Sequence, residues 1–255
     1  MEREYIHGAV AWRLGWLLLG VVLAGPTMAG TIGVAVASNF VQPMAALVAE
    51  FEAQTGHRVR VSSGSTGKLY AQIVNGAPFD VFLAANAREP ERLVATGMAV
   101  AKSRRTYARG RLALWANGAE IDPRNVGERV CNAPRLAIAN PRTAPYGSAA
   151  FEVLQALGCV DTVRSHLVRG ENIAQTYQFV ATGNVPLGFI ARSQLRGEAA
   201  GRFWLVPEWM HSPIEQQVVL LSHGASSALA QAFVDFLGRE PAKELIRGFG
   251  YDISP

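Results

Sequence analysis

The sequence predicts an α/β protein in which mostly parallel sheets are covered by helices on both faces. Short apolar runs typical of buried strands alternate along the chain with segments whose apolar residues share one helical face. Loops rich in Gly, Ser, Asn and Pro separate them, and this repeated strand–helix order favours parallel sheets. The 255 residues are 49% apolar and 17% charged, which excludes a disordered chain and allows one large domain or two lobes.

The first 29 residues have the pattern of a secretory signal peptide. Arg3 and Arg13 precede an apolar run over residues 14–24, Pro26 ends this run, and small residues lead up to Ala29. We therefore expect export and cleavage after Ala29. The run is short for a membrane span, so an uncleaved anchor is the less favoured alternative. Because no Cys lies near the cut, a lipoprotein is not expected.

Three strand–helix pairs are expected in the first part of the mature chain. Thr31–Ala37 is an apolar strand, and the helix that follows has Pro43 in its first turn and Gly56 at its end. The next two strands are expected at Val59–Val61 and Val81–Ala85, and the next two helices at the segment with Leu69, Ile73 and Val74 on one side and at Pro90–Thr96.

The rest of the chain continues this order. A new block begins at Arg111–Trp115. Strands are then expected at Leu136–Ala139, Leu187–Ile190 and Val218–Ser222, and helices at Ser148–Leu157, Ile173–Val180, Ser227–Leu237 and Ala242–Arg247. In parallel sheets, ligands bind beyond the carboxyl ends of the strands, at the first turns of the following helices. The strand-to-helix turns are therefore the places to look for a site.

Four of these turns are built from small or hydroxyl-bearing residues. A helix N-terminus presents free N–H groups and a partial positive charge, and hydroxyls add donors, so such turns suit an anion. Ser, Thr and Asn are also common helix caps, which alone explains any single turn. A net charge of +4 is weak support for an anionic partner. The four turns are Ser38-Asn39, Ser65-Thr66-Gly67, Pro145-Tyr146-Gly147 and Asn172-Ile173.

Sequence motifs for catalysis, metal binding and nucleic-acid binding are not found. Gly64–Leu69 lacks the spacing of a phosphate loop and has Leu69 where such loops need Ser or Thr. No Gly-x-Ser-x-Gly, no His-Glu-x-x-His, no obvious acid–base pair and no basic run occurs in the sequence. Cys131 and Cys159 are the 2 cysteines of an exported chain, and they form either a disulfide or two buried thiols.

Six segments occur in the same order as in a known family. The resemblance extends over the chain from about Thr31 to Ile253. The six segments are AVASNF (Ala35–Phe40), Ser62–Asn86, Ala137–Gly147, Gly170–Thr176, Val185–Ala191 and GYDI (Gly250–Ile253). In these segments the sequence resembles the periplasmic molybdate-binding proteins, which are solute receptors of molybdate ABC transporters. The Ser-rich turn followed by NGAPFDVF is the most specific part.

The resemblance implies the two-lobed fold of a type II-like periplasmic binding protein, with the ligand in the cleft between the lobes. Residues 30–109 and 217–255 would form one lobe and residues 110–216 the other, so the chain would cross between the lobes twice. Both cysteines fall in the second lobe, where a disulfide would not restrain closure.

The family's ligand residues can be carried over to matching positions of this sequence. Ser38 and Asn39 match the first family turn, which implies a hydroxyl and a backbone N–H as donors. Thr66 matches the Ser that binds oxyanion in the second turn, and Ser65 beside it is the alternative.

The third and fourth turns supply the remaining expected donors. Tyr146 stands where the third-turn ligand lies, and Ile173 stands where a backbone N–H closes the site. Some relatives have a ligand Tyr at the position of Ala191, and Tyr146 could replace it through its phenol or its backbone.

The expected function is the binding of molybdate and tungstate, without catalysis or a cofactor. The metal would be held only as its oxyanion, by a monomer that passes it to a membrane permease and has no nucleic-acid partner. Molybdate near neutral pH is a tetrahedral dianion that only accepts hydrogen bonds, so a shell of neutral donors would suit it. The alternatives are a receptor for another tetrahedral oxyanion such as sulfate, and an exported enzyme or sensor domain on the same scaffold.

Overall fold

A computed structural model of the chain describes residues 1, 29–195 and 202–253. Most of the expected signal peptide, residues 2–28, therefore lies outside the described residues, and its cleavage stays a prediction. Among the helices that are described, none is long and apolar enough to cross a membrane.

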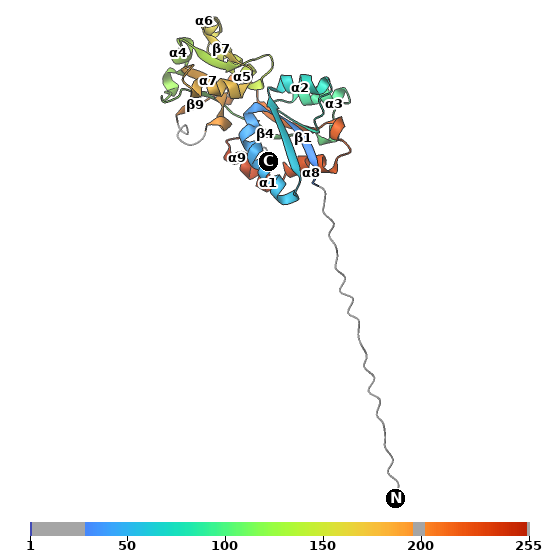
Figure 1. Ribbon diagram of the computed structural model, residues 1–255. Coiled ribbons are helices and arrows are strands. Elements are labelled where there is room, and N and C mark those ends of the chain that lie inside the picture. Colours follow the sequence, from blue (N-terminus) through green and yellow to red (C-terminus); the bar gives the residue numbers. More distant parts are fainter. Residues whose placement is uncertain (2–28, 196–201, 254–255) are drawn as a thin grey trace.

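The described chain forms two bodies, each built on one five-stranded sheet (Figure 1). In the first body the strand order is β2 (Arg58–Gly64), β1 (Thr31–Ala37), β3 (Val81–Ala84), β10 (Ile214–Leu220) and β4 (Arg105–Gly110). In the second body it is β7 (Leu167–Gly170), β6 (Leu136–Ala139), β8 (Leu187–Ala191), β5 (Leu112–Trp115) and β9 (Phe203–Leu205).

Each sheet is mostly parallel, as predicted, with one reversed strand. Strand β10 is antiparallel to both of its neighbours in the first sheet, and β5 is antiparallel to both of its neighbours in the second. The pairings among β1, β2 and β3 and among β6, β7 and β8 are parallel. The reversed strands lie next to the two places where the chain passes from one sheet to the other. The limits of the two lobes stay a prediction.

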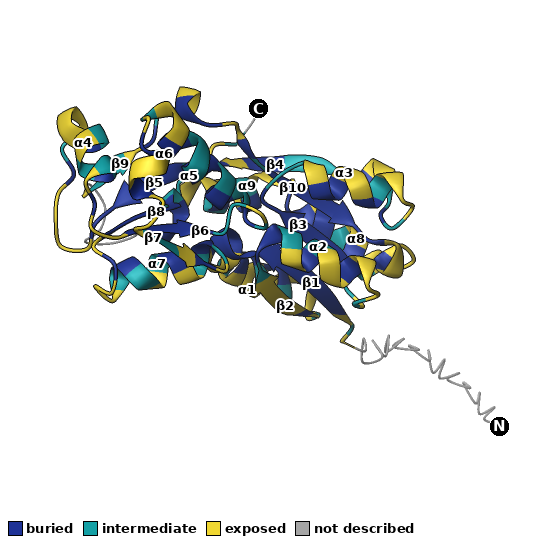
Figure 2. Ribbon diagram, turned by 90° about the horizontal axis from the view of Figure 1, so that it is seen from above, coloured by how far each residue is buried: buried dark blue, intermediate teal, exposed yellow. Residues whose placement is uncertain are grey.

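Helices cover both faces of each sheet, with buried inner faces and exposed outer faces (Figure 2). The first body has α1 (Val41–Thr55), α2 (Thr66–Val74), α3 (Arg88–Ala95), α8 (Ala228–Phe236) and α9 (Glu240–Gly248). The second has α4 (Val126–Cys131), α5 (Pro145–Ala156), α6 (Val160–Val163) and α7 (Ile173–Ala181). Helix α1 ends at Gly56, which adopts the left-handed conformation with a φ of 71° that favours glycine.

The apolar strands are buried on both faces, which explains their continuous apolar sequence. In β1, Val34 and Val36 pack into one core while Ala35 packs into another on the opposite face. In β5, Leu112 and Leu114 face one core and Ala113 faces a second. Each sheet is therefore a rigid central layer that holds the turns at its carboxyl edge in place.

Two local features differ from or complete the sequence expectations. Helix α5 begins at Pro145, three residues before the expected Ser148, because Pro at the first helical position is already in a helical conformation. Cys131 and Cys159 form a disulfide with a Cα–Cα distance of 5.1 Å, an alternative that the sequence left open. Both cysteines belong to the second body, so the bond does not link the two bodies.

Candidate functional site

All five expected ligand residues line one small cavity between the two bodies. Its volume is about 10 Å³, close to that of a single water-sized sphere. Such a space suits a small ion and excludes a bound sugar, amino acid or peptide in this arrangement. The lining consists of Ala37, Ser38, Asn39, Gly64, Ser65, Thr66, Ala85, Ala144, Pro145, Tyr146 and Ile173.

The cavity lies where four strand-to-helix turns meet. The short helix η1 (Ser38–Phe40) follows β1, and α2 follows β2, both in the first body. In the second body α5 follows β6 and α7 follows β7. The carboxyl ends of parallel strands share one edge of a sheet, so this fold brings together turns that are far apart in the sequence.

The cavity lining holds no carboxylate, amine, guanidinium or imidazole group. Tyr146 is the single ionisable residue in it, and burial raises the pKa of its hydroxyl well above the usual value of 10. Within the described ranges, no group of His, Cys, Asp and Glu could hold a metal ion. The site is therefore a neutral set of hydrogen-bonding groups.

The second turn offers two hydroxyl groups, of which one lacks a hydrogen-bond partner and the other already accepts a hydrogen bond. The hydroxyl of Ser65 is buried and has no hydrogen-bond partner in the described structure. The Thr66 Oγ1 atom accepts a hydrogen bond of 3.0 Å from the backbone N–H of Ala85, and its own hydrogen stays available. A buried hydroxyl without a partner carries a free-energy cost, so Ser65 is ready to donate to a ligand.

The first turn offers the Ser38 hydroxyl and the main chain of Asn39. The Asn39 Nδ2 atom donates to Gln216 Oε1 at 2.7 Å and to the Tyr251 hydroxyl at 2.9 Å. These bonds direct the Asn39 side chain into a buried network. The backbone N–H of Asn39 is therefore its group for a ligand, in line with the resemblance.

The Tyr146 hydroxyl is turned toward the crossing between the two sheets. A Cβ atom at Gly110, the last residue of β4, would collide with Tyr146 Oη, so the hydroxyl lies directly against the Gly110 backbone. Gly110 does not line the cavity. The group that Tyr146 offers at the cavity is therefore its backbone N–H in the first turn of α5, which has no partner within the helix.

Ile173 is the first residue of α7, and its environment also accounts for Ala191. Asn172 caps this helix by accepting a hydrogen bond of 3.0 Å from the Gln175 N–H. The Gln194 side chain accepts from the Ala191 N–H at 3.0 Å and donates to the Ile173 carbonyl at 3.2 Å. Ala191 is thus connected to the fourth turn through Gln194, without a side chain that could reach a ligand.

The two bodies are in direct contact around the cavity. The Gly67 N–H donates to the Thr143 carbonyl at 2.9 Å, and Lys68 forms an ion pair with Glu171. Gly67 and Lys68 belong to the first body, and their partners belong to the second. The structure therefore represents a closed arrangement of the two bodies.

The cationic groups near the site lie in a groove outside the cavity. This groove has a volume of about 380 Å³ and shares Ala85, Ala144 and Pro145 with the cavity lining. Arg88 and Arg142 line the groove together with Glu152. Arg88 is paired with the buried Glu89 at 2.6 Å, so the positive charge near the site is partly neutralised, and it lies outside the cavity wall.

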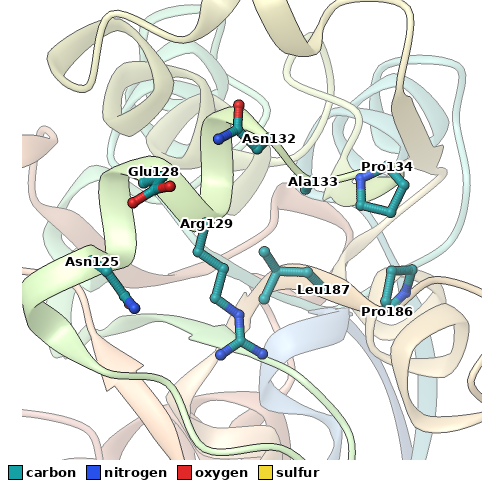
Figure 3. Close-up of a pocket in the computed structure, with 8 residues that line it drawn as sticks. All are labelled: Asn125, Glu128, Arg129, Asn132, Ala133, Pro134, Pro186 and Leu187. Carbon is teal, nitrogen blue, oxygen red and sulfur yellow. The ribbon is translucent and has the colours of Figure 1, made fainter.

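A separate cavity of about 400 Å³ opens on the second body, and none of the expected ligand residues lines it (Figure 3). Pro134 and Pro186 lie just before β6 and β8, so this cavity is at the amino ends of those strands. Ligands of such sheets bind at the opposite edge. The lining residues are Asn125, Glu128, Arg129, Asn132, Ala133, Pro134, Pro186 and Leu187.

Sequence reasoning found the polar residues of the cavity and missed its apolar wall. Ala37, Gly64 and Ala85 each end or directly follow a strand that had been recognised, and this position was the available signal. Ala144 and Pro145 precede Tyr146 at the start of α5. Small side chains there let backbone N–H groups approach a ligand closely.

Comparison with known proteins gives consistent matches over nearly the whole described chain. Residues 32–252 match the family described as bacterial extracellular solute-binding protein. The chain is 45% identical over 236 residues to the molybdate-binding protein ModA of Rhodobacter capsulatus, covering 92% of this chain and 93% of that protein. It is 46% identical over 236 residues to ModA of Azotobacter vinelandii, covering 91% and 94%. The solved Azotobacter vinelandii periplasmic molybdate-binding protein matches with a TM-score of 0.83 and 37% identity, over 88% of this chain and 100% of that one.

Proposed function

Because the chain belongs to the family of bacterial extracellular solute-binding proteins, we propose that it is a periplasmic receptor for molybdate. It captures molybdate, and tungstate as well, and delivers the anion to the permease of an ABC transporter. Two relatives at 45% and 46% identity, each named a molybdate-binding protein, support this specificity. The family consists of transport receptors, so the role is binding without catalysis and needs no cofactor.

The observation that carries the proposal is the neutral cavity in which all five expected residues meet. The donors are the hydroxyls of Ser38, Ser65 and Thr66 and the backbone N–H groups of Asn39, Tyr146 and Ile173. Hydrogen bonds to a charged group are worth about 1.5–3 kcal/mol each, so a few such donors support tight binding. A dianion without a proton needs donors alone, whereas protonated phosphate also needs an acceptor.

The cellular setting follows from the same assignment. The signal peptide directs export and is removed after Ala29, and the mature protein is a periplasmic monomer without a lipid anchor. Arg142 in the groove attracts an anion toward the cavity, since the charge of Arg88 is compensated by Glu89, and the neutral donors then replace the water shell of the anion.

A titration with four oxyanions tests the proposal. Purified protein is mixed with molybdate, tungstate, sulfate or phosphate, and its melting temperature and binding heat are measured. Stabilisation follows RT ln(1 + [L]/Kd) and reaches about 4 kcal/mol at a thousandfold excess over Kd. We expect strong stabilisation by molybdate and tungstate and little by the other two anions.

The same titration decides between the alternatives. Preference for sulfate over molybdate would replace the proposed ligand with another tetrahedral oxyanion. No stabilisation by any of the four anions would favour an exported enzyme or sensor domain instead.

A further inference from the structure

The first turn of α2 and the loop before α5 join the two bodies through a backbone hydrogen bond. The Gly67 N–H donates a hydrogen bond of 2.9 Å to the Thr143 carbonyl. Gly67 directly follows Thr66 and Thr143 directly precedes Ala144, and both Thr66 and Ala144 line the cavity. The contact therefore lies beside the cavity, on both bodies.

A side chain at position 67 would press against the Thr143 backbone in this arrangement. A Cβ atom there would lie 3.1 Å from Thr143 Cα and 3.2 Å from the Thr143 carbonyl oxygen. These are backbone atoms, so they cannot rotate away as the end of a flexible side chain would. The second body would have to move by a few tenths of an ångström to accept even a methyl group.

The local conformation of Gly67 does not require glycine. Gly67 does not have a positive φ. It lies within α2, where alanine is intrinsically more favourable than glycine. The requirement for glycine comes from the Thr143 backbone. The neighbouring Lys68–Glu171 ion pair has both side chains about half exposed, and such pairs contribute little.

We propose that Gly67 is a positioning residue that lets the two bodies approach closely enough for donors of both to reach one oxyanion. The proposal rests on the proposed function and adds a residue that touches no ligand. Ser38 and Ser65 lie on one body, and Tyr146 and Ile173 on the other. A side chain at position 67 would keep the two bodies apart. The hydrogen bonds from each body to the anion would then lengthen together.

The test is Gly67→Ala, with Gly248→Ala as the matched control. Gly248 lies at the end of α9, has no positive φ, and an added Cβ there meets nothing within 4 Å. We expect Gly67→Ala to bind molybdate about tenfold more weakly, through faster dissociation, because several bonds to the anion weaken together. Without ligand its melting temperature should be equal or higher, because the better helix propensity of alanine within α2 offsets the loss of the single Gly67–Thr143 hydrogen bond when the variant's bodies move apart.

The opposite signs of these two effects separate positioning from a merely structural role. Unchanged molybdate affinity in Gly67→Ala would overturn the proposal. Loss of affinity together with an equal loss of stability without ligand would overturn it as well. Gly248→Ala should leave affinity at the wild-type value.

A measurement without ligand keeps the proposal separate from the proposed function. Hydrogen exchange of the residue-67 amide reports its bond to the Thr143 carbonyl. We expect slow exchange in the wild type and faster exchange in Gly67→Ala. If wild-type protein fails to bind molybdate, the proposed function fails while this comparison still tests the contact, and a fast-exchanging amide in the wild type would refute it.

Discussion

The Ser193 hydroxyl of the second body donates a hydrogen bond of 2.9 Å to the Asn39 carbonyl of the first body, across 154 residues of sequence. The Tyr251 hydroxyl lies 2.9 Å from the same carbonyl and 3.1 Å from Ser193 Oγ. All three residues are buried. The main chain of Asn39, which carries one expected ligand donor, is therefore held by a network that spans both bodies.

Replacing Ser193 with Ala should weaken ligand binding while the fold stays intact. The Asn39 carbonyl loses its bond to the second body, and one such bond is worth about 1 kcal/mol, or roughly fivefold in affinity. Calorimetric titration with molybdate measures the change. Ser222→Ala is the control, because the Ser222 hydroxyl bonds to the Gly97 carbonyl within the first body at 2.7 Å. Equal affinities of both variants would contradict the role given to the network.

Removing a hydroxyl donor from the cavity should cost more. Ser38→Ala, Ser65→Ala or Thr66→Ala should each weaken molybdate binding roughly 10- to 150-fold, which corresponds to a lost bond to a charged group. Ser65→Ala should keep or raise the stability of the ligand-free protein, because its buried hydroxyl has no protein partner. Thr66→Ser should restore binding.

A helix-cap variant serves as the control for these hydroxyl changes. Ser227 caps α8 by accepting a hydrogen bond of 3.1 Å from the Ala230 N–H, far from the cavity lining. Ser227→Ala should lower stability by about 1 kcal/mol and leave affinity unchanged. Wild-type affinity in all three cavity variants would refute the assigned donors.

Tyr146→Phe should preserve binding. The hydroxyl lies against Gly110, outside the cavity, and makes no hydrogen bond of good geometry in the described structure. Its removal therefore leaves the backbone donor in place, and affinity should change by less than about twofold. A large loss of molybdate affinity in calorimetry would instead assign the phenol itself to the anion.

Binding should be independent of pH between about 6.5 and 9.5, because the cavity residues stay neutral there. Burial raises the pKa of Tyr251 from its ordinary 10.0 to about 12, so the folded protein keeps this proton longer than the unfolded chain. Stability should therefore be complete below pH 10 and fall as the pH rises toward 12. Urea unfolding at pH 9 and pH 11 checks the second expectation. A binding midpoint near pH 6–7 would indicate an ionisable ligand group and contradict the first.

Reducing the Cys131–Cys159 disulfide should lower stability without changing affinity. The bond closes a loop with a sequence separation of 28, for which chain entropy predicts about 3–4 kcal/mol. Both cysteines lie in the second body, away from the cavity lining. Denaturation and molybdate titration with and without reductant measure the two quantities. A tenfold loss of affinity on reduction would mean that the bond shapes the site.

Three strands that sequence analysis missed lie at sheet edges, and of the four edge strands of the two described sheets it recognised β2, through the segment Val59–Val61. Strands β4, β7 and β9 are each the last strand of a sheet. β4 has the sequence RTYARG, whose arginines are compatible with an edge that is open to solvent on one side. The apolar run is thus a signal of the sheet centre, and edge strands depend on pairing that a single sequence does not reveal.

The turns that form the site could be predicted from the sequence. Which of their hydroxyl groups are already hydrogen-bonded, and where these groups point, could not be predicted. The Ser65–Thr66 turn was recognisable, but the bond from Ala85 to Thr66 depends on the packing of β3 beside α2. The direction of the Tyr146 hydroxyl likewise depends on Gly110, which is distant in sequence. Val74 was expected on the buried side of its helix and is 41% exposed, because α2 ends there. Contacts between segments far apart in the sequence decided the first two, and the end of the helix decided the third.

Because the wall of the cavity is neutral, binding of the ligand changes the net charge of the whole protein. No residue in the lining gains or loses a proton to compensate a bound dianion, so loading adds the full charge of the ligand to a chain whose net charge is +4. Empty and loaded molecules therefore differ by two units of charge at any pH near neutrality. Native electrophoresis could separate them without a label, and a downstream partner could distinguish them by their surface field as well as by their shape.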